Sequence, residues 1–191
     1  MKSVLIAIRP QWAEKIAKGI KTIEVRKTAP KEVPFKAYIY CTKEKKQDDI
    51  IWAGIFGDRG KWNGRVIGEF ICDRIEMVNA KCSDYGIDLF YHDCLTNGCL
   101  TEREIEKYFN VPEDRDLRSM KGNGYVWNIS DLKIYDTPKE LSEFSRPCSY
   151  SGLCFSCKRT SFKKDGNLLC NTKITRPPQS WMHVEDLGEE E

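Results

Sequence analysis

A helix stop followed at once by a strand, at residues 19–27, constrains the fold more than any other stretch. Gly19 is typical of the end of a helix, and the side chains after it alternate in character. In a strand from Lys21 to Lys27, one face would carry Lys21, Ile23 and Val25, and the other Thr22, Glu24 and Arg26. Since a strand this rich in charge is unusual as plain surface, we interpret it as the floor of a ligand site.

Hydrophobic periodicity predicts strands on both sides of this stretch, at residues 3–9, 35–41, 65–77, 122–135 and 179–184. A helix is predicted after Pro10, with an apolar stripe of Trp12, Ile16 and Ile20. Residues 80–118 are predicted to be helical in pieces, and Thr101 to Glu104 form a capping-box start. A last short helix is expected to open at Pro138. This pattern indicates an α+β fold in which a small, mixed, mostly antiparallel sheet curls into a β-barrel with helices around it.

The length of 191 residues fits one domain, predicted to span residues 1–187, with an acidic tail at 188–191. Lys plus Arg number 31 and Asp plus Glu 29, so the overall charge indicates no partner, whereas residues 145–178 are locally basic. The longest apolar run is too short to span a bilayer, and we find no leader sequence. Nine cysteines in such a chain favour thiols or metal ligands over disulfides. We therefore expect a cytoplasmic protein without a membrane partner.

Four of these cysteines predict a structural zinc site. Their spacing is Cys148-x5-Cys154-x2-Cys157-x12-Cys170, and structural zinc commonly takes four thiolates, two of them from a Cys-x2-Cys turn. The segment between the last two is basic and poor in apolar residues, so it needs a cross-link to hold a fold. Free thiols, or a redox pair at Cys154 and Cys157, are the alternatives.

The other cysteines carry weaker signals. His92, Cys94 and Cys99 are three potential metal ligands within eight residues, but ordinary packing explains them better than a metal site. Cys41, Cys72 and Cys82 lie in or beside apolar strands and are expected to be buried thiols.

Several motifs together resemble the ASCH family, whose members adopt a PUA-like barrel. They are Ile8–Ala13 leading to Ile16 and Gly19, then Lys21–Lys27, Val66–Phe70, Gly124–Trp127, Pro138–Leu141 and Arg176–Trp181. These pieces occur in the order typical of the family and are spread over most of the chain. Residues 42–64 and 146–175 lie outside the resemblance and are interpreted as insertions, the second as a zinc-knuckle-like segment.

The resemblance implies a cleft beside the barrel that suits RNA or a modified nucleoside. Some small members resemble amidohydrolases that remove the acetyl group from N4-acetylcytidine, using a lysine and a threonine of this strand and a later glutamate. Lys21 matches that lysine, whereas Glu24 occupies the position of the threonine, and no residue can be matched to the glutamate. Other members have been linked to ribonuclease activity, which cannot be mapped onto single residues here.

The candidate site centres on three charged residues. Lys21 is suited to hold a phosphate or a carbonyl, Glu24 to accept an exocyclic amine or a proton, and Arg26 to bind phosphate as a fork. Lys21 and Glu24 are also the candidate acid/base pair, although they would need a bulge or a strong twist to meet across a strand. The further candidate binding residues are Arg9, Thr22, Gln179, Ser180 and Trp181. Trp12 and Trp127 are expected to pack in the core, and Trp181 to line the cleft.

Three functions remain open on this basis. Binding of RNA or a modified nucleoside or nucleotide in the cleft is the first hypothesis. The alternative is a hydrolase that acts on an acylated nucleoside or on RNA. The third is a protein-interaction module in which the segment 146–175 docks a partner.

Overall fold

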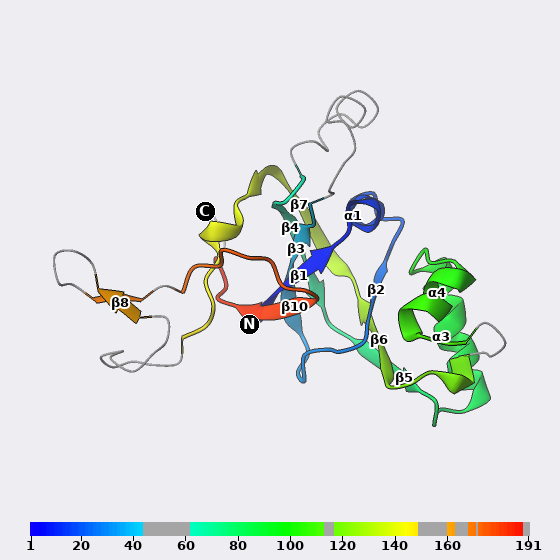
Figure 1. The fold of residues 1–191 in the computed structure, drawn as a ribbon. Coiled ribbons are helices and arrows are strands. Elements are labelled where there is room, and N and C mark those ends of the chain that lie inside the picture. Colours follow the sequence, from blue (N-terminus) through cyan, green and yellow to red (C-terminus); the bar gives the residue numbers. More distant parts are fainter. Residues whose placement is uncertain (44–61, 113–116, 149–159, 163–167, 171, 189–191) are drawn as a thin grey trace.

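The computed structural model describes residues 1–43, 62–112, 117–148, 160–162, 168–170 and 172–188 (Figure 1). The described strands are β1 (Lys2–Ile8), β2 (Ile23–Arg26), β3 (Phe35–Cys41), β4 (Val66–Cys72), β5 (Ile75–Asn79), β6 (Asn123–Asn128), β7 (Ser130–Lys139), β8 (Thr160–Phe162), β9 (Leu168–Cys170) and β10 (Trp181–Val184). The described helices are α1 (Pro10–Ala17), α3 (Asp84–Thr96) and α4 (Glu102–Phe109), with 3-10 turns η2 (Leu117–Ser119) and η3 (Leu141–Glu143).

The strands form a larger sheet, a smaller sheet and a hairpin. The larger sheet has the order β10-β1-β3-β4-β7, and only its β1/β3 pair is parallel. The smaller sheet has the antiparallel order β2-β6-β5, and β8 pairs with β9 alone. The mixed, mostly antiparallel α+β architecture is thereby confirmed. The closed barrel stays a prediction, because the described strands belong to separate sheets.

The larger sheet is buried on both faces because its central strands are apolar on both. Along β1, Val4, Ile6 and Ile8 enter one core, whereas Leu5 and Ala7 enter the other. The first core also holds Ala13 and Ile16 of α1, so this helix covers that face. Such double burial explains why the sequence of β1 is a nearly continuous apolar run rather than an alternating one.

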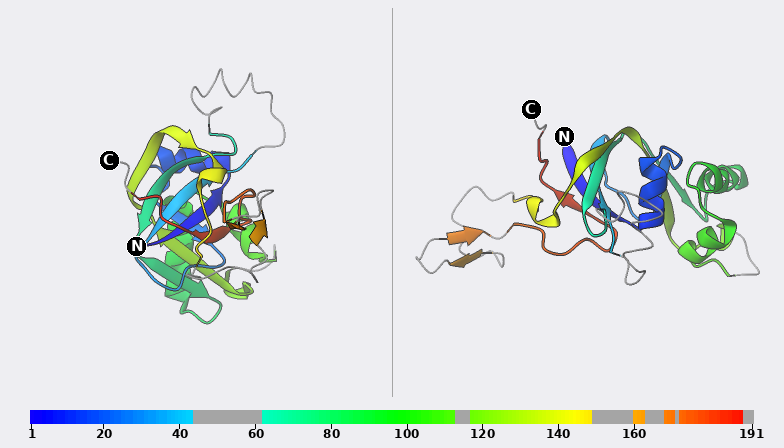
Figure 2. Two further views of the ribbon diagram at one scale, coloured as in Figure 1. Left: turned by 90° about the vertical axis from the view of Figure 1, so that its left-hand side faces the viewer. Right: turned by 90° about the horizontal axis from the view of Figure 1, so that it is seen from above.

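The smaller sheet packs against α3 and α4, which lie on its side away from the larger sheet (Figures 1 and 2). Ile23 and Val25 of β2 point into this core, as the predicted alternation of the strand requires. At Gly124 of β6, a Cβ atom would lie 2.8 Å from a ring carbon of Phe90 and 3.0 Å from one of Phe109. Glycine is needed there because the strand and the two helices approach so closely.

The two longest predicted strands are in fact pairs of strands that cross from one sheet to the other. Residues 65–77 contain β4 in the larger sheet and the start of β5 in the smaller one, and residues 122–135 contain β6 and the first part of β7. The two corners lie side by side, since the Asn128 amide donates to the Asp73 carboxylate at 2.8 Å. Periodicity missed both corners because each is only one or two residues long and has apolar strand residues on both sides.

Two helix predictions also need correction. Helix α1 ends at Ala17, and Gly19 at φ +69° turns the chain, so Ile20 leaves the apolar stripe and is 57% exposed. Pro138 opens no helix but lies in β7, and the 3-10 turn begins at Leu141. Proline is tolerated there because β7 is an edge strand of the larger sheet.

The predicted insertions fall largely outside the described residues. The stem of the segment 146–175 is described: the Arg146 N–H donates to the Thr172 carbonyl at 2.9 Å, and Ser145 bridges to Lys173. Beyond this stem, β8 and β9 lie apart from the other sheets (Figure 2). Among the described helices, none has the length and apolarity that a membrane span requires.

Candidate functional site

Lys21 and Glu24 meet because strand β2 begins only at Ile23, after Lys21. The Lys21 N–H donates to the Lys15 carbonyl at 3.0 Å, so this residue still belongs to the turn that ends α1. Its side chain is therefore free of the strand's alternation, and Lys21 Nζ lies 3.5 Å from Glu24 Oε2. The two side chains therefore meet without the bulge or strong twist that a strand beginning at Lys21 would have needed.

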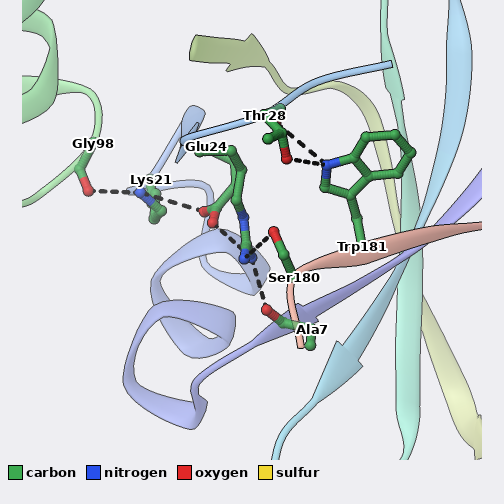
Figure 3. A network of polar contacts seen from close by, with 8 residues as sticks. Ala7, Lys21, Glu24, Thr28, Gly98, Ser180 and Trp181 are labelled. Atoms are coloured by element: carbon green, nitrogen blue, oxygen red, sulfur yellow. Dashed lines mark hydrogen bonds and ion pairs between the residues drawn. The ribbon is translucent and has the colours of Figure 1, made fainter. Parts of the chain in front are cut away.

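Lys21, Glu24 and Arg26 form a buried charge triad, and Figure 3 labels Lys21 and Glu24 with their neighbours. The three residues are only 3%, 7% and 9% exposed. Glu24 Oε1 lies 3.0 Å from Arg26 Nη2, and Lys21 Nζ donates to the Gly98 carbonyl between α3 and α4 at 2.7 Å. The triad holds two cations and one carboxylate, so one positive charge is left without a counter-ion within it.

Arg26 joins the two sheets where their backbones do not pair. Its Nη2 donates to the Ala7 carbonyl of β1 at 2.7 Å, and its Nη1 to Ser180 Oγ, directly before β10, at 3.4 Å. Since β2 is an edge strand of the smaller sheet, the guanidinium closes a gap between two sheet edges. The arginine is thus both a charge of the site and a structural link.

The triad leaves polar atoms without hydrogen bonds. Among the described residues, Glu24 Oε2 and Arg26 Nε are buried and have no hydrogen-bond partner. The indole Nε1 of Trp127, which is paired with Glu24 across β2 and β6, also has none. Leaving a buried polar group unsatisfied costs about 1–3 kcal/mol, so these atoms need a compensating interaction, which water, an ion or a ligand can each supply.

Two partly exposed aromatic residues flank the triad. The ring centroid of Trp12 in α1 lies 4.7 Å from Lys15 Nζ and 5.6 Å from Lys21 Nζ. Tyr108 of α4 is 36% exposed and lies 5.1 Å from Lys27 Nζ. Trp12 is half-buried and packs against the first core, in line with its predicted packing, and Trp127 is fully buried as predicted.

Tyr108 was missed by the sequence analysis because it lies in α4, far from β2 along the chain. Burial raises its pKa, the charge of Arg26 lowers it, the charge of Glu24 raises it and a hydrogen bond from the Lys27 backbone lowers it, with a net rise. The hydroxyl therefore lies within the electrostatic field of the triad. The only available signal was an aromatic residue on the polar face of a strongly amphipathic helix.

The other predicted binding residues divide into two groups. Ser180 contacts Arg26, and Trp181 packs edge-on against Trp127 with centroids 5.9 Å apart, while its Nε1 donates to Thr28 Oγ1 at 3.0 Å. Arg9, Thr22 and Gln179 are exposed, and within the described part of the chain no hydrogen bond or ion pair links their side chains to the triad.

The predicted zinc ligands lie mostly outside the described residues. Cys148 is exposed and free, whereas Cys154, Cys157 and the side chain of Cys170 are not described. In the described ranges, no three side chains of the metal-binding types converge, His92, Cys94 and Cys99 included. Cys94 is fully buried, and burial raises the pKa of its thiol to about 12. Cys41 and Cys72 are buried as predicted, and Cys82 is partly so.

A second polar cluster lies on the face of the larger sheet that carries the core of Leu5 and Ala7. Tyr38 and Lys36 of β3 both bind Asp186 Oδ1, at 2.5 Å and 3.0 Å, and Tyr135 donates to Glu69 Oε2 at 2.5 Å. A cavity of about 650 Å³ borders this cluster, between β7 and the C-terminal segment at Leu187. Each of the five polar side chains has a partner, so the cluster itself is complete.

Comparison with known proteins supports the fold. No family model and no curated protein matches the sequence. The structure of ASCH from Zymomonas mobilis aligns over 73% of this chain and 74% of its own, with 18% identity and a TM-score of 0.50. A point variant of that protein aligns over 73% and 75%, with the same identity and TM-score. The N-terminal domain of McrB from Staphylothermus marinus has 13% identity over 74% of this chain and 77% of its own, with a TM-score of 0.38, too low to support an argument. The chain thus has an ASCH-like fold.

Proposed function

We propose that this protein binds RNA or a modified nucleoside at the triad of Lys21, Glu24 and Arg26. The observation that carries the proposal is the pair of buried atoms, Glu24 Oε2 and Arg26 Nε, that have no hydrogen-bond partner among the described residues. One of these atoms accepts a hydrogen bond and the other donates one, and the edge of a nucleobase offers groups of both kinds. The excess positive charge of the triad favours a ligand that carries phosphate.

The triad is closed in this structure, so a ligand has to open it. The contact between Lys21 Nζ and Glu24 Oε2 is its longest, at 3.5 Å, and it leaves that oxygen without a hydrogen bond. Turning Lys21 towards a ligand therefore breaks the longer of the two ion pairs in the triad, together with the hydrogen bond from Lys21 to the Gly98 carbonyl, while Arg26 continues to hold Glu24 Oε1 at 3.0 Å. The flanking rings of Trp12 and Tyr108 add surfaces on which bases stack.

Binding of a fluorescent single-stranded RNA by wild type and by Lys21→Met tests the proposal. We expect an affinity that falls as salt rises, and a loss of about 10- to 100-fold in the variant, because a charge-assisted contact disappears. Lys18→Met is the matched control, since Lys18 is an exposed lysine of the same region that pairs with Glu14 and not with the triad among the described residues. Equal binding by wild type and Lys21→Met would refute the site.

Hydrolysis is a second candidate function, which the approach of Lys21 to Glu24 favours. An ammonium and a carboxylate at 3.5 Å are suited to exchange a proton with a substrate. Hydrolysis of the amide of N4-acetylcytidine would consume water and release acetate and cytidine. The assay is the appearance of free cytidine, with Lys21→Ala and Glu24→Gln as controls, and turnover no higher than in Lys21→Ala would exclude this chemistry.

A structural zinc ion held by Cys148, Cys154, Cys157 and Cys170 remains our proposal for the segment 146–175. The described stem, in which Arg146 pairs with Thr172, is consistent with a segment that leaves and rejoins the sheet at one place. Metal analysis of protein purified without added zinc should find about one zinc per chain. The protein-interaction function of this segment stays a prediction.

A further inference from the structure

The cavity beside β7 is separate from the triad. Its volume is about 650 Å³, and it lies between β7 and the C-terminal segment at Leu187. Its wall includes Glu69, which is paired with Tyr38 and therefore points to the same face of the larger sheet. Helix α1, which leads to Lys21, covers the opposite face. Cavities of about 300–1,000 Å³ are typical of sites for small molecules, so this one is large enough to hold a ligand.

A bulge in β7 builds one wall of the cavity. Residues 135–138 of β7 stand opposite a single residue of β4, Ile67, so the regular ladder of main-chain hydrogen bonds is interrupted there. A Cβ atom at Gly68 would clash with the Lys133 carbonyl oxygen, so glycine is needed where β7 enters the bulge. As a result, all of the residues 133–139 line the cavity, and their main chain is accessible along the edge of the sheet.

Charges of both signs line the cavity. The basic residues are Lys133 and Lys139, and the acidic residues are Glu69, Asp136 and Glu143. A ligand with only negative charge would meet the carboxylates, and a ligand with only positive charge would meet the ammonium groups. A ligand that carries one charge of each sign is complementary to both sets.

The contacts within the cavity show which charges are available to such a ligand. Glu69 Oε2 accepts a hydrogen bond from Tyr135, and Lys139 Nζ lies 5.4 Å from the centroid of the Tyr135 ring. Lys133 and Asp136, in contrast, have no ion-pair partner among the described residues. The ammonium of Lys133 is therefore available to a carboxylate, and the carboxylate of Asp136 to an ammonium.

We propose that this cavity binds a short peptide whose two ends are free. The carboxylate of the peptide pairs with Lys133 and its ammonium with Asp136, while the main chain of the bulge offers donors and acceptors to the peptide bonds. The volume corresponds to roughly 20 water molecules, which is more than a single amino acid displaces. The inference is independent of the function proposed for the triad, since the two sites lie on opposite faces of the larger sheet.

Calorimetric titration of the full chain with trialanine tests the inference. N-acetyl-trialanine and trialanine amide are the matched probes, because each lacks one of the two end charges. We expect each of them to bind about 5- to 50-fold more weakly than trialanine, since one charge-assisted contact is lost. Lys133→Met should weaken trialanine binding to the same extent. Lys81→Met is the control, because Lys81 is an exposed lysine that does not line the cavity.

Several results would overturn the inference. They are the absence of trialanine binding to the folded wild type, equal binding of the blocked peptides, and unchanged binding by a folded Lys133→Met protein. Binding of alanine as tight as that of trialanine would assign the cavity to amino acids instead. Binding of spermidine or tripolyphosphate without binding of trialanine would assign it to ligands of one charge. Thermal unfolding shows whether each variant is folded, and the function proposed for the triad survives all of these results.

Discussion

The described part of the molecule contains two clusters of charged side chains that differ in their hydrogen bonding and in their burial, since Lys21, Glu24 and Arg26 are buried whereas Asp186 is exposed. In the cluster of Lys36, Tyr38 and Asp186, with Glu69 and Tyr135 beside it, every polar side chain has a partner. In the triad of Lys21, Glu24 and Arg26 the side chains are paired as well, but two buried atoms have no hydrogen bond within the described residues, and one of them, Glu24 Oε2, has only its ion pair with Lys21. Complete pairing is typical of a cluster that stabilises the fold, whereas the buried atoms of the triad without hydrogen bonds are the feature on which the proposed binding site rests.

The complete cluster fastens the C-terminal segment to the larger sheet. Tyr38 donates to Asp186 and accepts a hydrogen bond from the Leu187 N–H at 3.0 Å. Burial acts to raise the pKa of Asp186, but hydrogen bonds from Tyr38 and Lys36 and the charge of Lys36 outweigh it and lower the pKa. The contacts of Asp186 therefore favour its ionised carboxylate, which is the form that holds the C-terminal segment against the larger sheet.

The largest expected effect on stability comes from Arg26→Ala. This change leaves Glu24 buried without its closest cation and removes the link to Ala7 of β1. Breaking a buried ion pair from one side costs about 3–5 kcal/mol, which urea denaturation measures. Arg74→Ala is the control, because Arg74 and Glu76 form an exposed pair and should contribute less than about 1 kcal/mol. Similar losses in the two variants would contradict the structural role of Arg26.

A smaller effect, about 1–3 kcal/mol, is expected from Lys36→Met, since it leaves Asp186 with one fewer donor. This variant sharpens the comparison, because RNA affinity should not change while stability falls. Lys21→Met, in contrast, should lower the affinity for RNA. If Lys36→Met weakened RNA binding as much as Lys21→Met, the assignment of a structural role to the Lys36 cluster and of a binding role to the triad would be wrong.

The smallest expected effect is on the stability of the protein at acidic pH. The folded-state pKa of Asp186 is below its ordinary value, so its contribution to stability is present above the unfolded-state pKa of about 3.9 and is lost as pH falls through the folded-state pKa. The free energy of unfolding of wild type should therefore fall more steeply below about pH 4 than that of Asp186→Asn. Denaturation curves between pH 7 and pH 3 measure this difference, and identical slopes would show that Asp186 contributes nothing.

Much of the fold was predictable because its signals are local. The apolar runs of β1 and β3, the capping box at Thr101 and the helix stop at Gly19 all act within a few residues. The corners near Asp73 and Ile129 were not predictable, because they depend on which sheet each half of the strand joins. The family resemblance was confirmed at the level of the fold, although no family model matches the sequence.

The sequence by itself determined the composition of the site. Lys21, Glu24 and Arg26 lie within six residues, and the alternation of β2 sends Ile23 and Val25 to the opposite face. Only the tertiary structure decided that the three charges are buried, that Gly98, Ala7 and Ser180 complete their contacts and that Tyr108 joins them. The physical reason is that side-chain alternation is a property of one strand, whereas burial and pairing depend on chain segments far away in the sequence.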